Sequence, residues 1–480
     1  MTGSRRPAVE RLTQGQQALW YLHRLAPDSA AYHVMCAVRV VGERRIDPEL
    51  LGAAVAAVEA RHDLLRSTFG EDEDGPHRVV RPAGLLTLDT VRTDASGEPL
   101  RERVRAAGTA PFRLGRESAF RIVLFDAGPE QVLLLAAHHI ATDAASQALL
   151  LGDVLAAYQG LAEGTGLPWT GPAGDFGLQV AAERRLLADT ERMDRLEEFW
   201  RTTCRGAAPV LDLPADRPRP ARPGHRGGTV AATLDGERLD RLVRAAAAAR
   251  TTPFVLLSAA FQVLLHRYTG EGEFLVGIPA SSRRPRELRS TVGYFVNPMV
   301  LRASLDEDTT FWQLTRRTAE RLRAAMPNQE YPFPMLPNAL GVARDASRSP
   351  VFQVTFTLVS AGRLDPLTDL LTDVGGQRVL DHAGLRLAAY DLPQQEGQFD
   401  LAVEVLAGSG GMTALFRYSG DLFDRPTVER MSRHYLRLLD ALTAEPDRRV
   451  AGVRLTDDEE RALLLALSAG EPAPAAARAA

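Results

Sequence analysis

The stretch QVLLLAAHHIATDA, residues 131–144, gives the strongest indication of the fold class. Residues 131–138 contain the continuous apolar run VLLLAA (132–137), which is typical of a buried strand, and two adjacent histidines follow it. A helix is predicted directly after it, from 144 to 161, because apolar side chains recur there at helical spacing. A buried strand that leads into a helix is a common building unit of α/β and α+β proteins.

The same alternation of strands and helices continues on both sides of this stretch. Asp47 is suited to cap a helix that runs through Leu64, and Thr252 with Pro253 is suited to open another that reaches Tyr268. Further helices are expected at 181–203, 309–326 and 425–442, and strands at 273–278, 352–357, 399–406 and 412–418. The chain is therefore expected to have an α/β (α+β) architecture in two halves of similar layout.

A segment rich in proline and arginine, residues 211–228, separates the two halves. Its sequence, LDLPADRPRPARPGHRGG, is incompatible with a helix or a central strand, because proline lacks the backbone donor that both require. Such a segment can also be a binding tail, but we expect a surface crossover here, within a linker of about 205–228. This division gives an N-terminal subdomain at 1–176, a C-terminal subdomain at 177–467 and a disordered tail at 468–480.

The composition excludes several classes of protein. The 480 residues carry 57 basic and 61 acidic side chains, so no domain-wide basic surface for nucleic acid is expected. All the basic residues are arginine, which excludes mechanisms that need a lysine. The N-terminus has no apolar signal segment, and no apolar run approaches the ~20 residues of a membrane span. Two distant cysteines, Cys36 and Cys204, indicate buried thiols and a cytoplasmic protein.

The two adjacent histidines are the candidate centre of chemistry. Neighbouring strand residues point to opposite faces, so His138 and His139 are expected to have different roles. One can be held inside the fold while the other acts as a base, and Asp143 can orient an imidazole or pair with an arginine. A purely structural alternative is a strand-end histidine pair followed by an N-capping aspartate. No HExxH motif is present and the other histidines occur singly, so no metal site is expected.

Motifs for other mechanisms are missing from the sequence. It has no GxSxG nucleophile elbow and no GxxxxGK[ST] or GxGxxG phosphate loop. A base without a covalent nucleophile or a bound cofactor favours direct attack of one substrate on another, which is group transfer.

The motif around the histidines resembles HHxxxDG, a motif of the condensation domains of nonribosomal peptide synthetases. Further segments resemble other motifs of that family in the same order and spacing over about residues 12–442. They are LTQGQQALWYLHRLAPDSAAYHV (12–34), RHDLLRSTF (61–69), LPADRPRP (213–220), VGYFVNPMVLR (292–302), NQEYPFPML (328–336) and RDASRSPVFQVTF (344–356).

This resemblance implies a fold of two subdomains, each similar to chloramphenicol acetyltransferase, in a V-shaped pseudo-dimer with a central tunnel. It implies that carrier proteins dock at the tunnel mouths and insert phosphopantetheine arms. The donor arm carries an acyl thioester, and a carrier-bound or free small molecule supplies an amine or a hydroxyl. The resemblance implies no bound cofactor, no nucleic acid and no membrane.

The resemblance also implies roles for individual residues. His139, the second histidine of the motif, is expected to accept or position the proton of the attacking nucleophile. His138 is expected to be structural. Asp143 is expected to pair with Arg283, with Arg284 as the neighbouring alternative.

Three further residues are expected near the tunnel. Ala144 replaces the last glycine of the motif, so it is either strained, harmless at a helix start, or a methyl group that narrows the tunnel. Tyr294 and Asn297 either line the tunnel or connect the two halves.

The segment LTDDEERALLLAL (455–467) resembles the linker into an adenylation domain, and a free-standing enzyme is favoured over an excised piece. The rival to a condensation enzyme is a non-catalytic module that recruits tailoring enzymes or carrier proteins. An acyltransferase that uses coenzyme A is disfavoured by the set of motifs.

Overall fold

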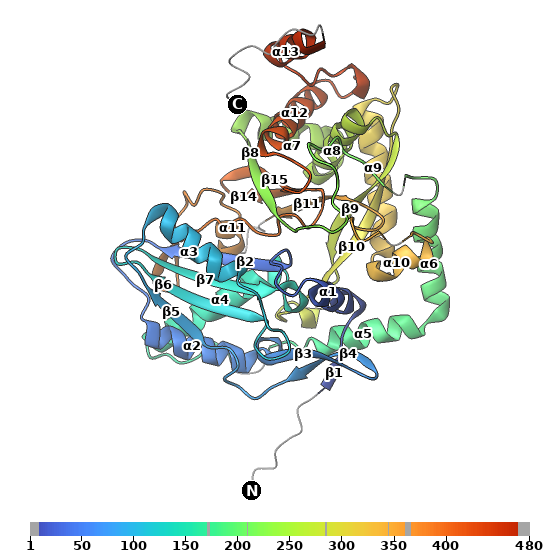
Figure 1. Cartoon of the computed structure of the whole chain (residues 1–480). Helices are drawn as coiled ribbons and strands as arrows, with labels where there is room; N and C mark the ends of the chain where they lie inside the picture. Colours follow the sequence, from blue (N-terminus) through green and yellow to red (C-terminus); the bar gives the residue numbers. More distant parts are fainter. Residues whose placement is uncertain are drawn as a thin grey trace.

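The computed structural model describes residues 9–169, 173–208, 210–283, 286–343, 345–360 and 366–468. Two lobes, each with a six-stranded sheet, lie one above the other (Figure 1). The mixed α/β fold expected from the sequence is confirmed. Arg284, Arg344 and the tail from 469 to 480, which the sequence expectations include, lie outside the described residues.

The first sheet has the strand order β12-β13-β2-β7-β6-β5. Its central strand β7 is buried along its whole length, as its apolar run predicts. The bounds are β2 (His33–Val40), β5 (Leu88–Arg92), β6 (Phe120–Asp126), β7 (Gln131–His138), β12 (Leu380–His382) and β13 (Leu385–Ala389), with helices α1 (Gln14–Leu25), α2 (Pro48–Arg61), α3 (Gly97–Thr109), α4 (Ala144–Ala162) and α11 (Pro366–Leu371). A separate small sheet joins β1 (Val9–Arg11), β4 (Gly75–Val80) and β3 (Ser67–Asp72).

The second sheet has the strand order β10-β9-β11-β14-β15-β8. Along β14, buried and half-buried residues alternate, which is the pattern of a strand with one face on the core. The bounds are β8 (Gly227–Leu234), β9 (Glu273–Ser281), β10 (Val296–Ser304), β11 (Val354–Ser360), β14 (Leu401–Gly408) and β15 (Gly411–Ser419), with helices α7 (Gly236–Ala248), α8 (Pro253–Thr269), α9 (Phe311–Ala325), α10 (Leu336–Ala339), α12 (Arg425–Ala444) and α13 (Asp458–Ser468).

The second part of the chain also contributes to the first lobe. Strand β13 pairs antiparallel with β2, with Ala389 opposite Val38 and Leu387 opposite Val40. Leu385 and Leu387 belong to the same buried apolar cluster as the β7 side chains. The first sheet is therefore assembled from segments more than 200 residues apart, and the boundary expected at residue 177 stays a prediction.

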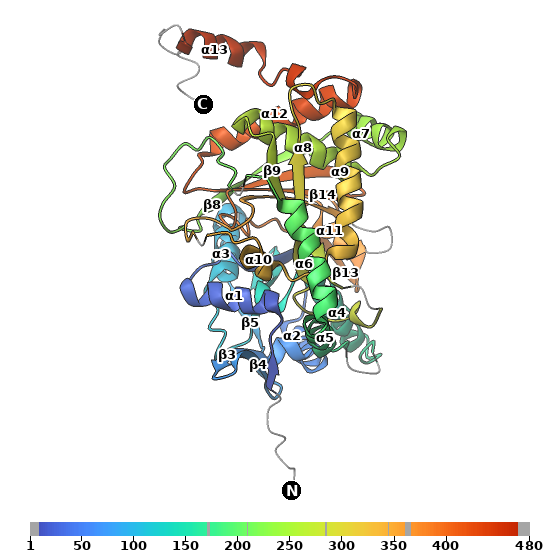
Figure 2. The ribbon, with the colours of Figure 1, turned by 90° about the vertical axis from the view of Figure 1, so that its right-hand side faces the viewer.

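The helix expected at 181–203 is two helices, which corrects the sequence prediction. The first, α5 (Gly177–Ala188), lies by the lower lobe, and the second, α6 (Thr190–Cys204), rises toward the upper lobe (Figure 2). Between them Asp189 leaves the helical region, with φ −88° and ψ 85°, and its side chain accepts a hydrogen bond from the backbone N–H of Arg192. An N-cap placed there starts a new helix in a new direction.

Two other boundaries and one helix cap differ from expectation. The crossover ends at Arg226, because Gly227 and Gly228 already pair with β15. The helix capped by Asp47 stops at Arg61 and is followed by a short 3₁₀ turn. Thr252 precedes α8, but its side chain makes no capping hydrogen bond.

No single described helix is long and apolar enough to cross a membrane; α7 and α8 reach that length and composition only when taken together, and the pair is bent by 104°. Within the same described ranges, His, Cys, Asp and Glu side chains nowhere gather in threes that could hold a metal ion.

Candidate active site

The two histidines lie where β7 ends and the chain turns toward α4. The backbone N–H of His138 still donates to the carbonyl of Ala119, as in the sheet, at 2.8 Å. The backbone N–H of His139 donates to the carbonyl of Tyr32, at 2.7 Å. A 3₁₀ turn, His139–Ala141, then leads to Asp143, which caps α4. The strand end thus fixes the backbone on both sides of the histidine pair.

The imidazole of His139 has a defined tautomer. Its Nδ1 lies 2.6 Å from the carbonyl oxygen of Thr142, which can only accept a hydrogen bond. Nδ1 therefore carries the proton, and Nε2 of the neutral ring has a lone pair available. Burial lowers the pKa of His139, against the opposing effects of the Thr142 carbonyl and of Asp143. At neutral pH the ring is therefore a neutral, half-buried imidazole that can accept a proton.

His138 points into the fold instead. Its side chain is buried, and its Nδ1 accepts a hydrogen bond from the backbone N–H of Ile140 at 3.1 Å. The rings of His23 and His33 lie edge-on to it, with centroid distances of 5.3 and 6.0 Å. Burial and these imidazoles lower its pKa well below the ordinary value. His138 is therefore a neutral packing residue that supports the turn.

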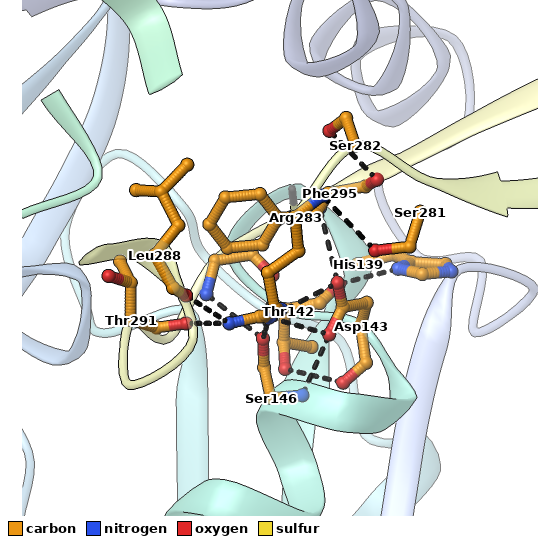
Figure 3. A network of polar contacts seen from close by, with 11 residues as sticks. His139, Thr142, Asp143, Ser146, Ser281, Ser282, Arg283, Leu288, Thr291 and Phe295 are labelled. Carbon is orange, nitrogen blue, oxygen red and sulfur yellow. Dashed lines mark hydrogen bonds and ion pairs between the residues drawn. The ribbon is translucent and has the colours of Figure 1, made fainter. Parts of the chain in front are cut away.

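Asp143 and Arg283 meet at the start of α4 (Figure 3). Arg283 Nη2 lies 3.2 Å from Asp143 Oδ1, and the two side chains are 10% and 6% exposed. Asp143 also accepts from the backbone N–H groups of Ser146, at 2.7 Å, and Phe295, at 3.2 Å. The Cζ atom of Arg283 lies 4.0 Å from the centre of the Phe295 ring. This contact network joins α4 to the segment that precedes β10.

The two terminal nitrogens of Arg283 make further hydrogen bonds. Its Nη1 donates to the carbonyl groups of Leu288, at 3.0 Å, and Thr291, and its Nη2 donates to Ser146 Oγ at 2.6 Å. Asp143 and Arg283 thus hold the start of α4 against the segment that precedes β10, and they act on the site by positioning it. The structure thus brings the predicted partners Asp143 and Arg283 together.

Tyr294 lies against the candidate base. Its ring meets that of His139 edge-on, with a centroid distance of 5.2 Å and an interplanar angle of 85°. Burial raises its pKa above the ordinary value, so its hydroxyl stays protonated at neutral pH. The structure thus brings Tyr294 together with His139.

Asn297 makes a different set of contacts. Its Nδ2 donates to the carbonyls of Gln329 and Tyr331, at 2.7 and 2.8 Å, and its Oδ1 accepts from the backbone N–H of Phe333 at 2.9 Å. The amide therefore holds the loop of residues 331–333, here called the YPF loop, against β10. Both polar atoms of the amide are hydrogen-bonded to backbone groups.

Ala144 is the first residue of α4, and its side chain is exposed. It is not among the residues with positive φ, so the strained alternative for this replacement of glycine is wrong.

Several supporting residues were missed by sequence reasoning. Gln16 on α1 donates to the carbonyl of Ile140 at 2.8 Å and so ties α1 to the turn after His139. Gly15 leaves space for the Tyr294 ring, since a Cβ atom there would lie 2.7 Å from Tyr294 Cε1. The contacts of Gln16 with Ile140 and of Gly15 with Tyr294 each join segments that lie far apart along the chain. The presence of a glycine at position 15 was therefore the only signal in the sequence.

The chain matches the family model of the condensation domain over residues 8–465. It is 30% identical over 472 residues to the dimodular nonribosomal peptide synthase of Bacillus subtilis (strain 168), a match that covers 96% of this chain and 19% of that protein. It is 30% identical over 458 residues to tyrocidine synthase 3 of Brevibacillus parabrevis, covering 95% and 7%. The chain thus spans less than a fifth of the length of these relatives.

Solved structures show the same fold. Holo-AB3403, a four-domain nonribosomal peptide synthetase bound to AMP and glycine, has a TM-score of 0.87 and 24% identity, covering 96% of this chain and 35% of that chain. The X-domain from teicoplanin biosynthesis, solved in complex with OxyB, has a TM-score of 0.81 and 29% identity, covering 95% and 98%. The expected two-lobed architecture is that of these proteins.

Proposed function

The chain belongs to the condensation-domain family, and on that premise we propose that it transfers an acyl group from a phosphopantetheine thioester of a carrier protein to an amine or hydroxyl acceptor. The product is an amide or an ester in nonribosomal peptide or hybrid polyketide biosynthesis. The observation that carries the proposal is the tautomer of His139, whose Nδ1 is held by the Thr142 carbonyl at 2.6 Å while Nε2 has its lone pair available.

The proposed reaction uses that lone pair. The acceptor nitrogen or oxygen attacks the thioester carbon, and Nε2 of His139 takes the proton that the acceptor loses. The carbonyl oxygen gains negative charge in the tetrahedral intermediate. The intermediate collapses with cleavage of the carbon–sulfur bond, and the proton passes from His139 to the departing thiolate. One amide or ester and one carrier thiol result, so His139 ends as it began.

The same family membership supports a proposal for the substrates and the setting. We propose that acyl or peptidyl carrier proteins deliver the donor, and in some cases the acceptor, to the mouths of a tunnel between the lobes. The phosphopantetheine arrives with the carrier, so the chain itself needs no bound cofactor. A cytoplasmic location is supported by the free thiols of Cys36 and Cys204, both buried.

A second candidate function is a recruitment module. The observation in its favour is the similarity to the X-domain, which extends over 98% of that chain and whose solved complex contains OxyB. A module of this kind would bind a tailoring enzyme or a carrier protein without catalysing transfer. The Nε2 lone pair of His139 and the buried ion pair of Asp143 and Arg283 favour catalysis.

The test is transfer from an acyl-loaded carrier protein, followed by intact-protein mass spectrometry. A mixed pool of amines and alcohols is offered to the wild type and to His139→Ala. We expect the wild type alone to unload the carrier and to form a new amide or ester. Equal unloading by both proteins would contradict the role of His139, and carrier binding without unloading would favour the recruitment module.

A further inference from the structure

The backbone on both sides of Tyr294 is fastened to the start of α4. The hydroxyl of Ser146 donates to the carbonyl of Gly293 at 2.8 Å and accepts from the N–H of Gly293 at 3.1 Å. On the other side, the N–H of Phe295 donates to Asp143 Oδ2 at 3.2 Å. Because α4 follows directly after the turn that holds His139, these contacts fix Tyr294 relative to that imidazole.

A third element shapes the space that the Tyr294 ring occupies. Helix α1 carries Gly15 at the ring, where a Cβ atom would lie 2.7 Å from Cε1. The helix is fixed there by the bond from Gln16 to the carbonyl of Ile140, and its N-terminus by a capping box of Thr13 and Gln16. Any larger residue at position 15 would push the ring away from its present place. The ring therefore occupies a defined position, set by α1 and α4 together.

The hydroxyl of Tyr294 is available at this position. The side chain is half-buried, and no described residue forms a hydrogen bond with the hydroxyl. A protonated phenol is a hydrogen-bond donor. In the proposed reaction, His139 Nε2 already accepts the proton of the nucleophile. Tyr294 is therefore not needed as a second proton acceptor. During the reaction the thioester carbonyl oxygen gains negative charge. A hydrogen-bond donor near this oxygen would therefore stabilise the transition state.

We propose that Tyr294 is a second catalytic residue, whose hydroxyl donates a hydrogen bond to the carbonyl oxygen of the donor thioester as the acceptor attacks. This inference rests on the proposed acyl transfer. No proton leaves Tyr294; its hydrogen bond shortens as charge develops on the oxygen, which stabilises the transition state more than the bound substrate. The ring keeps its edge-on contact with His139 throughout.

The decisive variant is Tyr294→Phe, which removes the hydroxyl and keeps the ring. We expect kcat for transfer from the loaded carrier to fall about 10- to 100-fold, with KM for the carrier and the circular dichroism spectrum unchanged. The matched control is Tyr21→Phe, since Tyr21 is an exposed tyrosine of α1 at 59% exposure, and this control should transfer at the wild-type rate.

Two other variants separate the hydroxyl from the ring. Tyr294→Leu should lose no less activity than Tyr294→Phe. Gly15→Ala should lower kcat by displacing the ring, but should have little further effect in the Tyr294→Phe background.

The outcomes distinguish this inference from the proposed function. A wild type that transfers, with Tyr294→Phe within twofold of it, would overturn the role of the hydroxyl. Loss of activity in Tyr294→Leu alone would assign the residue a packing role only. A wild type that unloads no donor would overturn the proposed acyl transfer and the present inference with it.

Discussion

Removing one partner of the pair of Asp143 and Arg283 should destabilise the protein strongly. Both side chains are almost fully buried, at 6% and 10% exposed, so Asp143→Ala leaves a guanidinium in the interior without its counter-charge. Breaking a buried pair from one side costs about 3–5 kcal/mol. Loss of the N-cap of α4 adds about 1 kcal/mol. We expect the free energy of unfolding of Asp143→Ala to fall by about 4–6 kcal/mol.

The double variant decides whether the charge pair is the cause. Arg283→Met loses the charge and its bonds to the carbonyls of Leu288 and Thr291. In Asp143→Ala/Arg283→Met no charge remains buried, so the double variant should be more stable than the sum of the two losses predicts. The expected coupling energy is about 2 kcal/mol.

Urea unfolding followed by circular dichroism measures all four proteins under one condition. The variant pair Arg454→Met and Asp458→Ala is a matched control, because this ion pair is exposed, at 52% and 89%, and each change should cost less than about 1 kcal/mol. The reasoning would be refuted if the stability losses of the Asp143→Ala and Arg283→Met variants simply added in the double variant, with a coupling energy below about 0.5 kcal/mol.

Three further predictions concern single residues. Glu183 accepts from the backbone N–H of Gln14 at 2.6 Å, and burial raises its pKa from 4.5 to about 7. The folded state thus holds this proton more tightly than the unfolded chain, and stability should fall between about pH 4.5 and pH 7. In thermal scans the Tm advantage of Glu183→Gln over wild type should therefore grow from pH 5 to pH 8; parallel curves would contradict this. Asn297→Ala should lower the free energy of unfolding by about 2–3 kcal/mol in urea, because three hydrogen bonds to the YPF loop are lost. Ala144→Gly should cost less than about 1 kcal/mol in the same assay, since the backbone is already helical; a gain in stability would restore the strained alternative.

The elements with strong local patterns could be predicted from the sequence. The apolar run of β7 and the periodic helix α4 agree with the structure to within a residue or two. The break between α5 and α6 was missed because no glycine or proline marks it. The signal was present, since Asp189 followed by Thr190 and Glu191 is a good helix start, but it lay inside a periodic segment.

The pairing of distant segments was not accessible to local reasoning. Nothing in the sequence near Leu385–Ala389 indicates that this strand continues the first sheet beside β2. In the same way, the partners of His139 come from three segments, namely the motif itself with Thr142, the segment of Tyr32 and the segment of Tyr294, and only the first is local. Arg283 was found through the family resemblance, whereas Gly15, Gln16 and Ser146 act through contacts that spacing along the chain does not reveal.

The contribution of β13 to the first sheet limits how the protein can be divided. A fragment cut at residue 176 would lack β13, and the backbone of β2 would be left as an open edge. Open edges pair with other chains, so such a fragment is prone to aggregate. Any chimera that exchanges one lobe between relatives would need to carry residues 380–389 with the first lobe, although they are encoded within the second. The first lobe therefore cannot be replaced as one continuous stretch of sequence, because one of its strands is supplied by the second part of the chain.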